Sequence, residues 1–423
     1  MNERTVKPDF LFETSWEICN KVGGINTVVA TKSLILVNEF NDKFVLIGPD
    51  LWRETKQNPA FIEDESLFSS WKYKANEEGL RVRIGRWDIV SKPIVILIDF
   101  TPFISKKNEI FKSFWETYKL DSISGGMDYI EAATFGYAAG KVIESFCKYH
   151  LTTRDKVVAH FHEWMTGSGI LYLRKTVPQI ATVFTTHATA VGRSIAGNGL
   201  PLYSKLEEYN GDSKAKELNI VAKQSMEKIS AKTTDAFTTV SEITATECKQ
   251  FLEKEVDVVT PNGFEDNFVP VDEEFTKKRE AARLKMKEIA EALLGYKLSD
   301  DALFIANSGR YEFRNKGIDV FINAMGELNK QEDLNKEVVS FVLVPANNYG
   351  PRKDLQEKLA GKSDKKLDQT FLTHGLHDSE YDPILNEIKS TGLSNKKDDN
   401  VKIIFAPCYL NGTDGIFNLK YYD

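Results

Sequence analysis

Short apolar runs rich in β-branched residues recur along the chain, with helix-forming stretches between them. The runs are continuous rather than alternating in polarity, which is typical of strands buried on both faces of a parallel sheet. Nine segments have this character: 43–47, 93–100, 157–161, 180–185, 236–240, 256–259, 302–306, 338–344 and 401–405. Helices are predicted between them, for example over 129–149 and 225–232. Strands that alternate with helices in this way predict an α/β protein of the doubly wound kind.

A domain boundary is predicted near residue 264. Pro261-Asn262-Gly263 is a turn signal, and residues 272–294 that follow it are charged and helix-forming, with Gly295 as a stop. We therefore expect an N-terminal domain over 1–264 and a second domain over 265–423 that begins with this long helix. The polar stretch 389–400 is predicted to be a surface loop.

Length and composition narrow the class of protein. At about 150 residues per domain, 423 residues suggest two to three domains. The net charge of -7 favours neither nucleic acid nor anionic lipid as a partner. We expect no membrane span and no signal peptide, because no apolar run reaches about 18 residues and the N-terminus is polar. The four cysteines lie far apart, which argues against disulfides and favours a cytoplasmic location.

A pair of glycines follows the first expected strand. The segment 20–25 contains Lys21, Gly23 and Gly24, and a helix is predicted to follow it. Adjacent glycines at a strand-to-helix turn let the backbone approach a ligand, and a helix N-terminus favours a phosphate or carboxylate. Lys21 adds a positive charge. A tight turn without any ligand is the alternative interpretation.

Histidines stand at the ends of two neighbouring predicted strands. His160 and His162 point to the same face of one strand, with Glu163 beside them, and His187 follows the next strand, shortly before Arg193. The histidines His160, His162 and His187 could be zinc ligands, as in a metal-dependent hydrolase. They could instead hydrogen-bond a ligand in a crevice at the carboxyl ends of a parallel sheet. Histidines satisfied within the core are the third possibility.

Three cations follow the first predicted strand of the second domain. Arg310, Arg314 and Lys316 lie between Gly309 and Gly317, a composition that suits an anion such as a diphosphate. A solvated basic loop is the alternative, although it leaves both glycines without a role. The chain has no D-x-D pair, no G-x-x-x-x-G-K-[ST] loop and no G-x-S-x-G motif. Phosphate charge would therefore be met by Arg, Lys and helix ends, and we expect no metal and no cofactor.

Taken together and in order, these motifs resemble the animal and fungal type of glycogen synthase. The matching segments are Lys21-Val22-Gly23-Gly24, His160-Phe161-His162-Glu163-Trp164, Thr185-Thr186-His187-Ala188-Thr189 with Gly192-Arg193, Phe237-Thr238-Thr239-Val240-Ser241, Pro261-Asn262-Gly263 and Gly309-Arg310-Tyr311-Glu312-Phe313 with Asn315-Lys316-Gly317. The resemblance implies a GT-B fold, in which two Rossmann-like domains face a crevice. It also implies a hexosyltransferase that moves glucose from UDP-glucose to the non-reducing end of an α-1,4-glucan with retention.

The resemblance assigns roles to individual residues. His187 would contact the donor glucose beside the reacting carbon, while Arg310 and Lys316 would hold the diphosphate; these three are the expected catalytic residues. The expected substrate-binding residues are Lys21, Gly23, Gly24, His162, Glu163 and Arg193. Glycogen and a nucleotide sugar are the expected partners, and the residues alone do not separate UDP-glucose from ADP-glucose.

The resemblance also implies that the second domain is incomplete. In the family a further strand, a donor-binding segment and a helix returning to the first domain follow the last motifs found here. We therefore expect apolar surface to be exposed, a homo-oligomer to form, and these 423 residues to bind without turnover. A non-catalytic glycan- or nucleotide-binding protein of the same fold is the remaining alternative beside the metal-dependent hydrolase.

Overall fold

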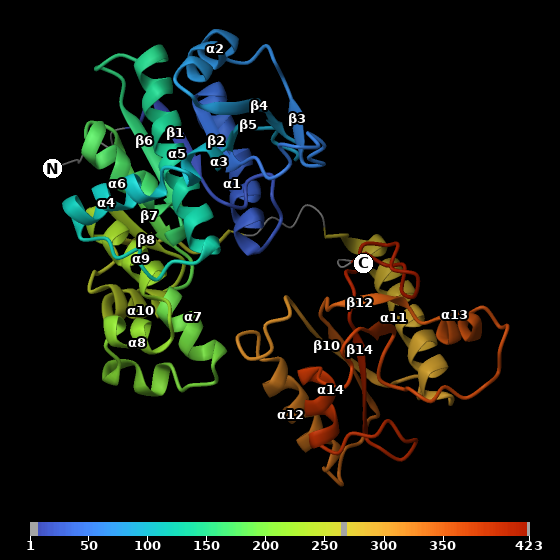
Figure 1. The fold of residues 1–423 in the computed structure, drawn as a ribbon. Helices are drawn as coiled ribbons and strands as arrows, with labels where there is room; N and C mark the ends of the chain where they lie inside the picture. Colours follow the sequence, from blue (N-terminus) through green and yellow to red (C-terminus); the bar gives the residue numbers. More distant parts are fainter. Residues whose placement is uncertain (1–6, 264–268, 421–423) are drawn as a thin grey trace. The chain divides into compact units, whose positions relative to one another are not determined.

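A computed structural model describes residues 7–263 and 269–420 of the chain (Figure 1). The chain forms two compact units: residues 1–195 with 200–264, and residues 196–199 with 265–423. The predicted boundary at residue 264 and the first residues of the predicted second domain lie outside the described residues. Within the described ranges, no helix combines the length and the apolar character that a membrane span needs.

The first unit is built on a nine-stranded sheet of order β3-β4-β5-β2-β1-β6-β7-β8-β9. Neighbouring strands from β5 to β9 are parallel, whereas β4 runs antiparallel to both β5 and β3. The strands are β1 (Phe10–Thr14), β2 (Phe44–Pro49), β3 (Phe61–Glu63), β4 (Arg81–Trp87), β5 (Ile94–Asp99), β6 (Val157–His162), β7 (Ala181–Thr186), β8 (Ala236–Thr239) and β9 (Val258–Val259).

Helices cover both faces of this sheet. Alternate residues of β2 point to opposite faces: Val45 and Ile47 belong to the apolar cluster that contains the residues of α5, whereas Phe44 and Leu46 pack with those of α1. The helices of this unit are α1 (Gly24–Phe40), α2 (Ser69–Glu77), α3 (Thr101–Ile104), α4 (Lys107–Tyr118), α5 (Met127–His150), α6 (Gly167–Thr176), α7 (Ala190–Gly197), α8 (Gly211–Glu217), α9 (Val221–Thr233) and α10 (Glu242–Leu252), with short 3₁₀ turns η1 (Asn41–Lys43), η2 (Trp164–Thr166) and η3 (Tyr203–Glu208).

The second unit repeats the architecture on a smaller scale. Its parallel sheet has the order β10-β11-β14, and a separate antiparallel pair is formed by β12 and β13. Val339 and Phe341 of β11 pack in one apolar cluster with α11, and Val338 and Val342 pack in another with α12 and α14. The elements are α11 (Asp272–Leu294), β10 (Leu303–Ser308), α12 (Ile318–Asn329), β11 (Val338–Leu343), β12 (Asn348–Pro351), α13 (Lys353–Leu359), β13 (His374–Leu376), α14 (Pro383–Ser390) and β14 (Val401–Ala406).

The predicted α/β class with two Rossmann-like units is confirmed. Each of the nine predicted strands is present within a few residues, and α11 spans 272–294 as predicted, with Gly295 in the left-handed conformation (φ 79°) that ends it. The expectation that all of these strands are buried on both faces is wrong for β9 and β10, neither of which has a buried residue.

Two further differences concern polar residues and short strands. The predicted surface loop 389–400 contains buried Leu393 and Asn395, and the Asn395 amide is satisfied by the backbone of Thr370 and Ile403. A polar side chain can therefore be buried here without an unpaired group.

The antiparallel strands β3, β4, β12 and β13 were not predicted, because short or alternating strands have a weaker signal than continuous apolar runs.

Candidate active site

The glycine pair lies at the N-terminus of α1, as predicted. Gly23 is the extended residue before the helix, and Gly24 is its first residue. The Glu17 carboxylate accepts hydrogen bonds from the backbone N–H groups of Gly23 and Asn26, both at 2.8 Å. Glu17 thus supplies the negative charge that the first turn of α1 lacks.

Open space surrounds the second glycine. A Cβ atom added to Gly24 would meet no atom within 4 Å, and Lys21 in the same turn is exposed. Packing within the described residues therefore does not require a glycine at position 24. The turn leaves space beside the N-terminus of α1, where backbone N–H groups favour an anion.

A chain of hydrogen-bonded polar side chains links the carboxyl ends of β1, β6 and β7. Glu13 is fully buried, and its Oε1 atom lies 2.5 Å from Lys32 Nζ and 2.6 Å from His162 Nε2. His162 Nδ1 lies 2.9 Å from His187 Nε2. Because β1, β6 and β7 are adjacent parallel strands, residues that end each strand meet at one edge of the sheet.

The imidazoles of this chain are neutral at neutral pH. Burial lowers the pKa of His162 well below its usual value, and the Lys32 charge acts in the same direction. Burial and Lys32 also lower the pKa of His187 to about 4. Neutral rings each have one N–H donor and one acceptor nitrogen, so the direction of every hydrogen bond in the chain matters.

The three histidines lie in a hydrogen-bonded network at the carboxyl ends of β6 and β7. His160 Nε2 lies 2.7 Å from Thr185 Oγ1, and both ring nitrogens of His162 are in contact with protein groups. Ligand atoms of Glu13, His160 and His162 do lie within 4.8 Å of one another, but hydrogen bonds account for that proximity. The predicted common face of His160 and His162 is present, with ring centroids 4.2 Å apart.

Three buried carboxylates hold the loop that carries His187. Glu163 accepts a hydrogen bond from the N–H of His187 at 2.9 Å, Glu227 accepts one from the N–H of Ala190 at 2.9 Å, and Glu247 accepts one from the Thr189 hydroxyl at 2.6 Å. Burial raises the pKa of Glu163 to about 7 and that of Glu227 to about 8. Hydrogen bonds to three separate segments of the chain therefore fix the position of this loop.

Glu163 itself has a strained backbone. Its φ of 65° and ψ of 163° are unusual for a residue with a side chain and cost about 1–3 kcal/mol. The same residue bonds the His187 loop, and Arg193, which is exposed on α7, lowers the Glu163 pKa against the larger effect of burial. Strain at such a position is typical of functional sites.

Sequence reasoning missed four members of this network: Glu13, Lys32, Glu227 and Glu247. The available signal was weak. Glu13 ends an apolar strand segment, and Glu227 lies in a helix between the apolar residues Met226 and Ile229. A charged residue on an apolar face is a reason to look for a partner, but the pattern does not say which partner.

In the second unit the predicted cations lie on the loop between β10 and α12. Arg310 forms an ion pair of 2.7 Å with Glu312, and Arg314 forms a longer one of 3.6 Å with Asp319. Lys316 is exposed, and among the described residues it has no acidic partner. Its stem passes 3.8 Å from the point where Gly309 would carry a Cβ atom, so Gly309 and Lys316 are neighbours.

The same loop is fixed at its base. The Tyr311 hydroxyl donates a hydrogen bond to Asp382, which also caps α14 through the N–H of Leu385. The Asn307 side-chain oxygen, at the carboxyl end of β10, is buried and has no hydrogen-bond partner within the described part of the chain. The loop thus presents cations and an unsatisfied acceptor at the end of a parallel strand.

Another polar cluster in this unit consists of His374, Cys408 and Asp414. His374 Nδ1 contacts the Thr373 hydroxyl at 2.9 Å, and His374 Nε2 donates to the Asp414 carbonyl at 3.0 Å. The Asp414 carboxylate accepts from the backbone of residues 416–418. These contacts satisfy the histidine and the carboxylate structurally.

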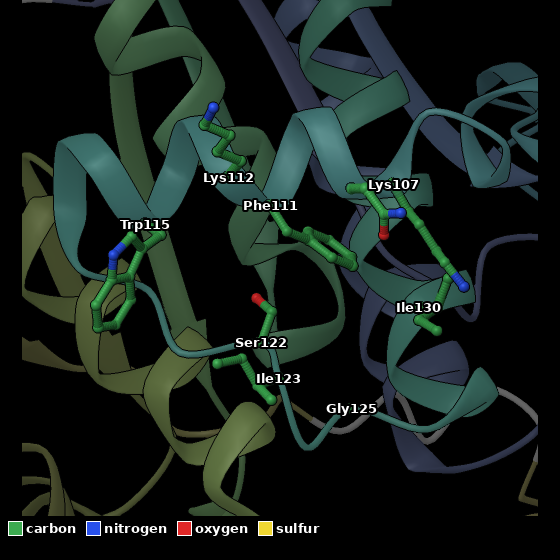
Figure 2. A pocket seen from close by; sticks show the side chains of 9 residues that line it. Lys107, Phe111, Lys112, Trp115, Ser122, Ile123, Gly125 and Ile130 are labelled. Carbon is green, nitrogen blue, oxygen red and sulfur yellow. The ribbon is translucent and has the colours of Figure 1, made fainter.

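A surface pocket of about 510 Å³ lies beside α4 and the start of α5. Figure 2 shows Phe111 and Trp115 on α4, with Ser122 and Ile123 on the connection that leads to α5. None of the predicted site residues lines this pocket, so it is separate from the candidate active site.

Comparison with known proteins agrees with the motifs. The family model described as glycogen synthase matches residues 13–367 and 355–423. The chain belongs to the glycogen synthase family. Curated relatives named glycogen [starch] synthase include the rat liver protein, 30% identical over 97% of this chain, the human liver protein, 31% identical over all of it, and the Neurospora crassa protein, 29% identical over 99%. The resemblance to the animal and fungal type is thus confirmed.

The chain spans 66% of the length of the rat liver relative and 67% of the human one. Among solved structures, the chain is similar to the catalytic domain of Arabidopsis thaliana starch synthase IV, bound to ADP and acarbose, with 16% identity and a TM-score of 0.46. The match covers 90% of this chain and 76% of that structure. The chain is also similar to an α,α-trehalose-phosphate synthase from Burkholderia vietnamiensis, with 11% identity and a TM-score of 0.45. That match covers 93% of this chain and 73% of the other structure.

Proposed function

We propose that this chain carries the glucosyl-transfer site of a glycogen synthase, which transfers glucose from UDP-glucose to the non-reducing end of an α-1,4-glucan with retention. The observation that carries the proposal is the family match from residue 13 to residue 423. The local geometry supports it, because the residues that the resemblance singles out lie at the carboxyl ends of parallel strands in both units.

The phosphates of the donor are assigned to cations and helix ends. In the first unit, Lys21 is exposed and the space around Gly24 is open at the N-terminus of α1, whereas the N–H of Gly23 is bonded to Glu17. In the second unit, Arg310 and Lys316 offer a bidentate guanidinium and a point charge on one loop. Arg310 and Lys316 would neutralise the charge that grows on UDP as it departs, which is electrostatic catalysis that needs no D-x-D metal pair.

The glucose of the donor is assigned to the buried edge of the first unit. His187 is the expected contact beside the reacting carbon, with His162 behind it and Glu163 holding its backbone. Arg193 adds a positive charge near Glu163. Neutral, fixed hydrogen-bonding groups suit sugar hydroxyls and an oxocarbenium-like transition state.

The alternatives are less well supported. A metal-dependent hydrolase would need the ring nitrogens that His162 uses for Glu13 and His187, and the family match gives that function no support. A non-catalytic binding protein of the same fold would bind the donor without turnover, so the assay below distinguishes it. A cytoplasmic location, a homo-oligomer and the absence of a cofactor stay predictions.

The test measures both transfer and binding. The chain is incubated with glycogen and UDP-[¹⁴C]glucose, with ADP-[¹⁴C]glucose in parallel, and incorporated label is released with an α-1,4-specific glucanase. Donor binding is measured separately by calorimetry. For this chain we expect binding of UDP-glucose in preference to ADP-glucose, and absence of donor binding would overturn the proposal. The incorporation assay is repeated on a longer family chain that contains these residues, where label is expected only in α-1,4 linkage. Binding without incorporation by that longer chain would favour the non-catalytic alternative.

A further inference from the structure

Glu13 is the first residue of the hydrogen-bond chain at the ends of β1, β6 and β7. It determines which atom donates and which accepts in each of the later hydrogen bonds. Glu13 Oε1 contacts the Lys32 ammonium, which can only donate, so this oxygen is an acceptor. The same oxygen lies 2.6 Å from His162 Nε2, and that nitrogen must therefore carry the proton. Glu13 thus selects the tautomer of His162.

The tautomer of His162 in turn determines the tautomer of His187. In a neutral His162 that is protonated on Nε2, Nδ1 is an acceptor, and its partner 2.9 Å away is His187 Nε2. His187 Nε2 must then carry the proton of that ring. The neutral state on which this step relies agrees with the lowered pKa of both rings.

The other nitrogen of His187 is left as an acceptor. Nδ1 of this ring has no hydrogen-bond partner within residues 7–263 and 269–420, and the side chain is only half-buried. His160 does not compete for it, because its Nε2 atom contacts Thr185. An acceptor at this place binds a hydroxyl that donates its hydrogen, and a sugar supplies such hydroxyls.

We propose that Glu13 is a positioning residue that acts through His162 to hold His187 in the Nε2–H tautomer, so that His187 Nδ1 accepts a hydrogen bond from a hydroxyl of the donor sugar. The sugar as ligand rests on the proposed function, whereas the tautomer is a property of the chain alone. The acceptor nitrogen of His187 is then fixed before the ligand arrives, which reduces the cost of ordering the complex.

The experiment reads the tautomers directly by NMR. The chain has six histidines, so ¹⁵N-histidine labelling and long-range ¹H–¹⁵N correlation give six imidazoles to assign. We expect Nε2 to be protonated in both His162 and His187 of the wild-type protein at pH 7.5. A wild-type His187 protonated on Nδ1 would overturn the proposal without any variant.

Two substitutions at position 13 separate the tautomer effect from packing. Glu13→Met removes the acceptor at similar length, and we expect His187 to change from one tautomer to a mixture. Glu13→Gln keeps an acceptor oxygen and should retain the wild-type tautomer. The matched control is Glu144→Gln on α5. Glu144 pairs with Tyr172 and Lys148 and not with the histidine network, so this variant makes the same change of side chain away from it. A single Nε2–H tautomer in folded Glu13→Met would contradict the proposal.

Activity gives the second readout. If glucose is transferred, Glu13→Met should lower turnover by about 10- to 100-fold, the usual loss when a group that orients a functional histidine is removed, and Glu13→Gln should recover most of it. A wild-type Nε2–H tautomer without donor binding would refute the proposed function but leave the role of Glu13 intact. Glucose transfer by a protein whose His187 is protonated on Nδ1 would support the proposed function but refute the role of Glu13.

Discussion

The histidine and carboxylate network of the first unit is largely buried and its members are already bonded to one another, whereas the candidate residues of the second unit are cations on a loop that reach solvent. His162 and its partner Glu13 are almost completely inaccessible, and each functional ring has a defined partner. Arg310 and Lys316, by contrast, reach solvent, and the acid paired with Arg310 lies on its own loop. The first unit presents neutral groups in a fixed geometry; the second presents charge.

The difference indicates how each region should respond to substitution. Removing a buried group leaves its partners without hydrogen bonds, so activity and stability change together. Removing an exposed cation costs little stability, because a surface ion pair contributes little to folding. The predictions below test this separation, beginning with the largest expected effect.

The largest effect is expected for the cations of the second unit. In a longer family chain that contains these residues, Arg310→Ala and Lys316→Ala should each lower kcat by about 10²–10³-fold, the usual size for removing a group that stabilises the transition state. The melting temperature should change little. The measurement is glucose incorporation at saturating UDP-glucose. Lys330→Ala is the surface control, because within the described residues its side chain pairs with Glu327 alone, at the end of α12. Wild-type kcat in both variants would refute the diphosphate assignment.

A buried carboxylate of the first unit should instead affect folding. Glu227→Ala leaves the N–H of Ala190 and the Thr186 hydroxyl without their acceptor and opens a cavity. We expect a loss of about 2–4 kcal/mol in the free energy of unfolding. Urea unfolding followed by intrinsic fluorescence measures it, with Lys316→Ala as the comparison. Equal stability of the two variants would contradict the contrast between the units.

The same carboxylate should make stability depend on pH. Because the pKa of Glu227 is about 8 in the folded protein and about 4.5 when unfolded, the unfolded chain releases this proton first as pH rises. Stability from this group is complete below pH 4.5 and is lost as pH rises towards 8, by at most about 1.4 kcal/mol per pH unit. Glu227→Gln does not titrate, so its unfolding free energy relative to wild type should increase between pH 5 and 8. A constant difference would disprove the raised pKa.

The smallest expected effect is that of a chelator. If Arg310 and Lys316 supply the charge that a D-x-D metal pair would supply, as proposed, the transfer activity of a longer family chain that contains these residues should be unchanged after treatment with EDTA and gel filtration. Metal content is measured by elemental analysis on the same sample. Loss of activity that zinc restores would return His160, His162 and His187 to the role of metal ligands.

Much of the fold could be predicted because its signals are local. Continuous β-branched runs identified all the parallel strands after β1, and the α11 helix was predicted over its observed range from periodicity and Gly295. His162, His187, Arg310 and their neighbours could be placed at the ends of strands for the same reason, since the carboxyl ends of parallel strands share an edge.

What the sequence by itself determined is therefore which residues form each strand and helix, and which motifs stand at strand ends. The tertiary structure alone decided the partners. Glu13 and His162 are 149 positions apart, and Thr189 and Glu247 are 58 apart, yet each pair shares a hydrogen bond. Strand order and the close approach of distant segments set such contacts, and no local pattern records them. For the same reason, only the folded chain shows that His187 is held by Glu163, positioned next to His162 and thereby linked to Glu13.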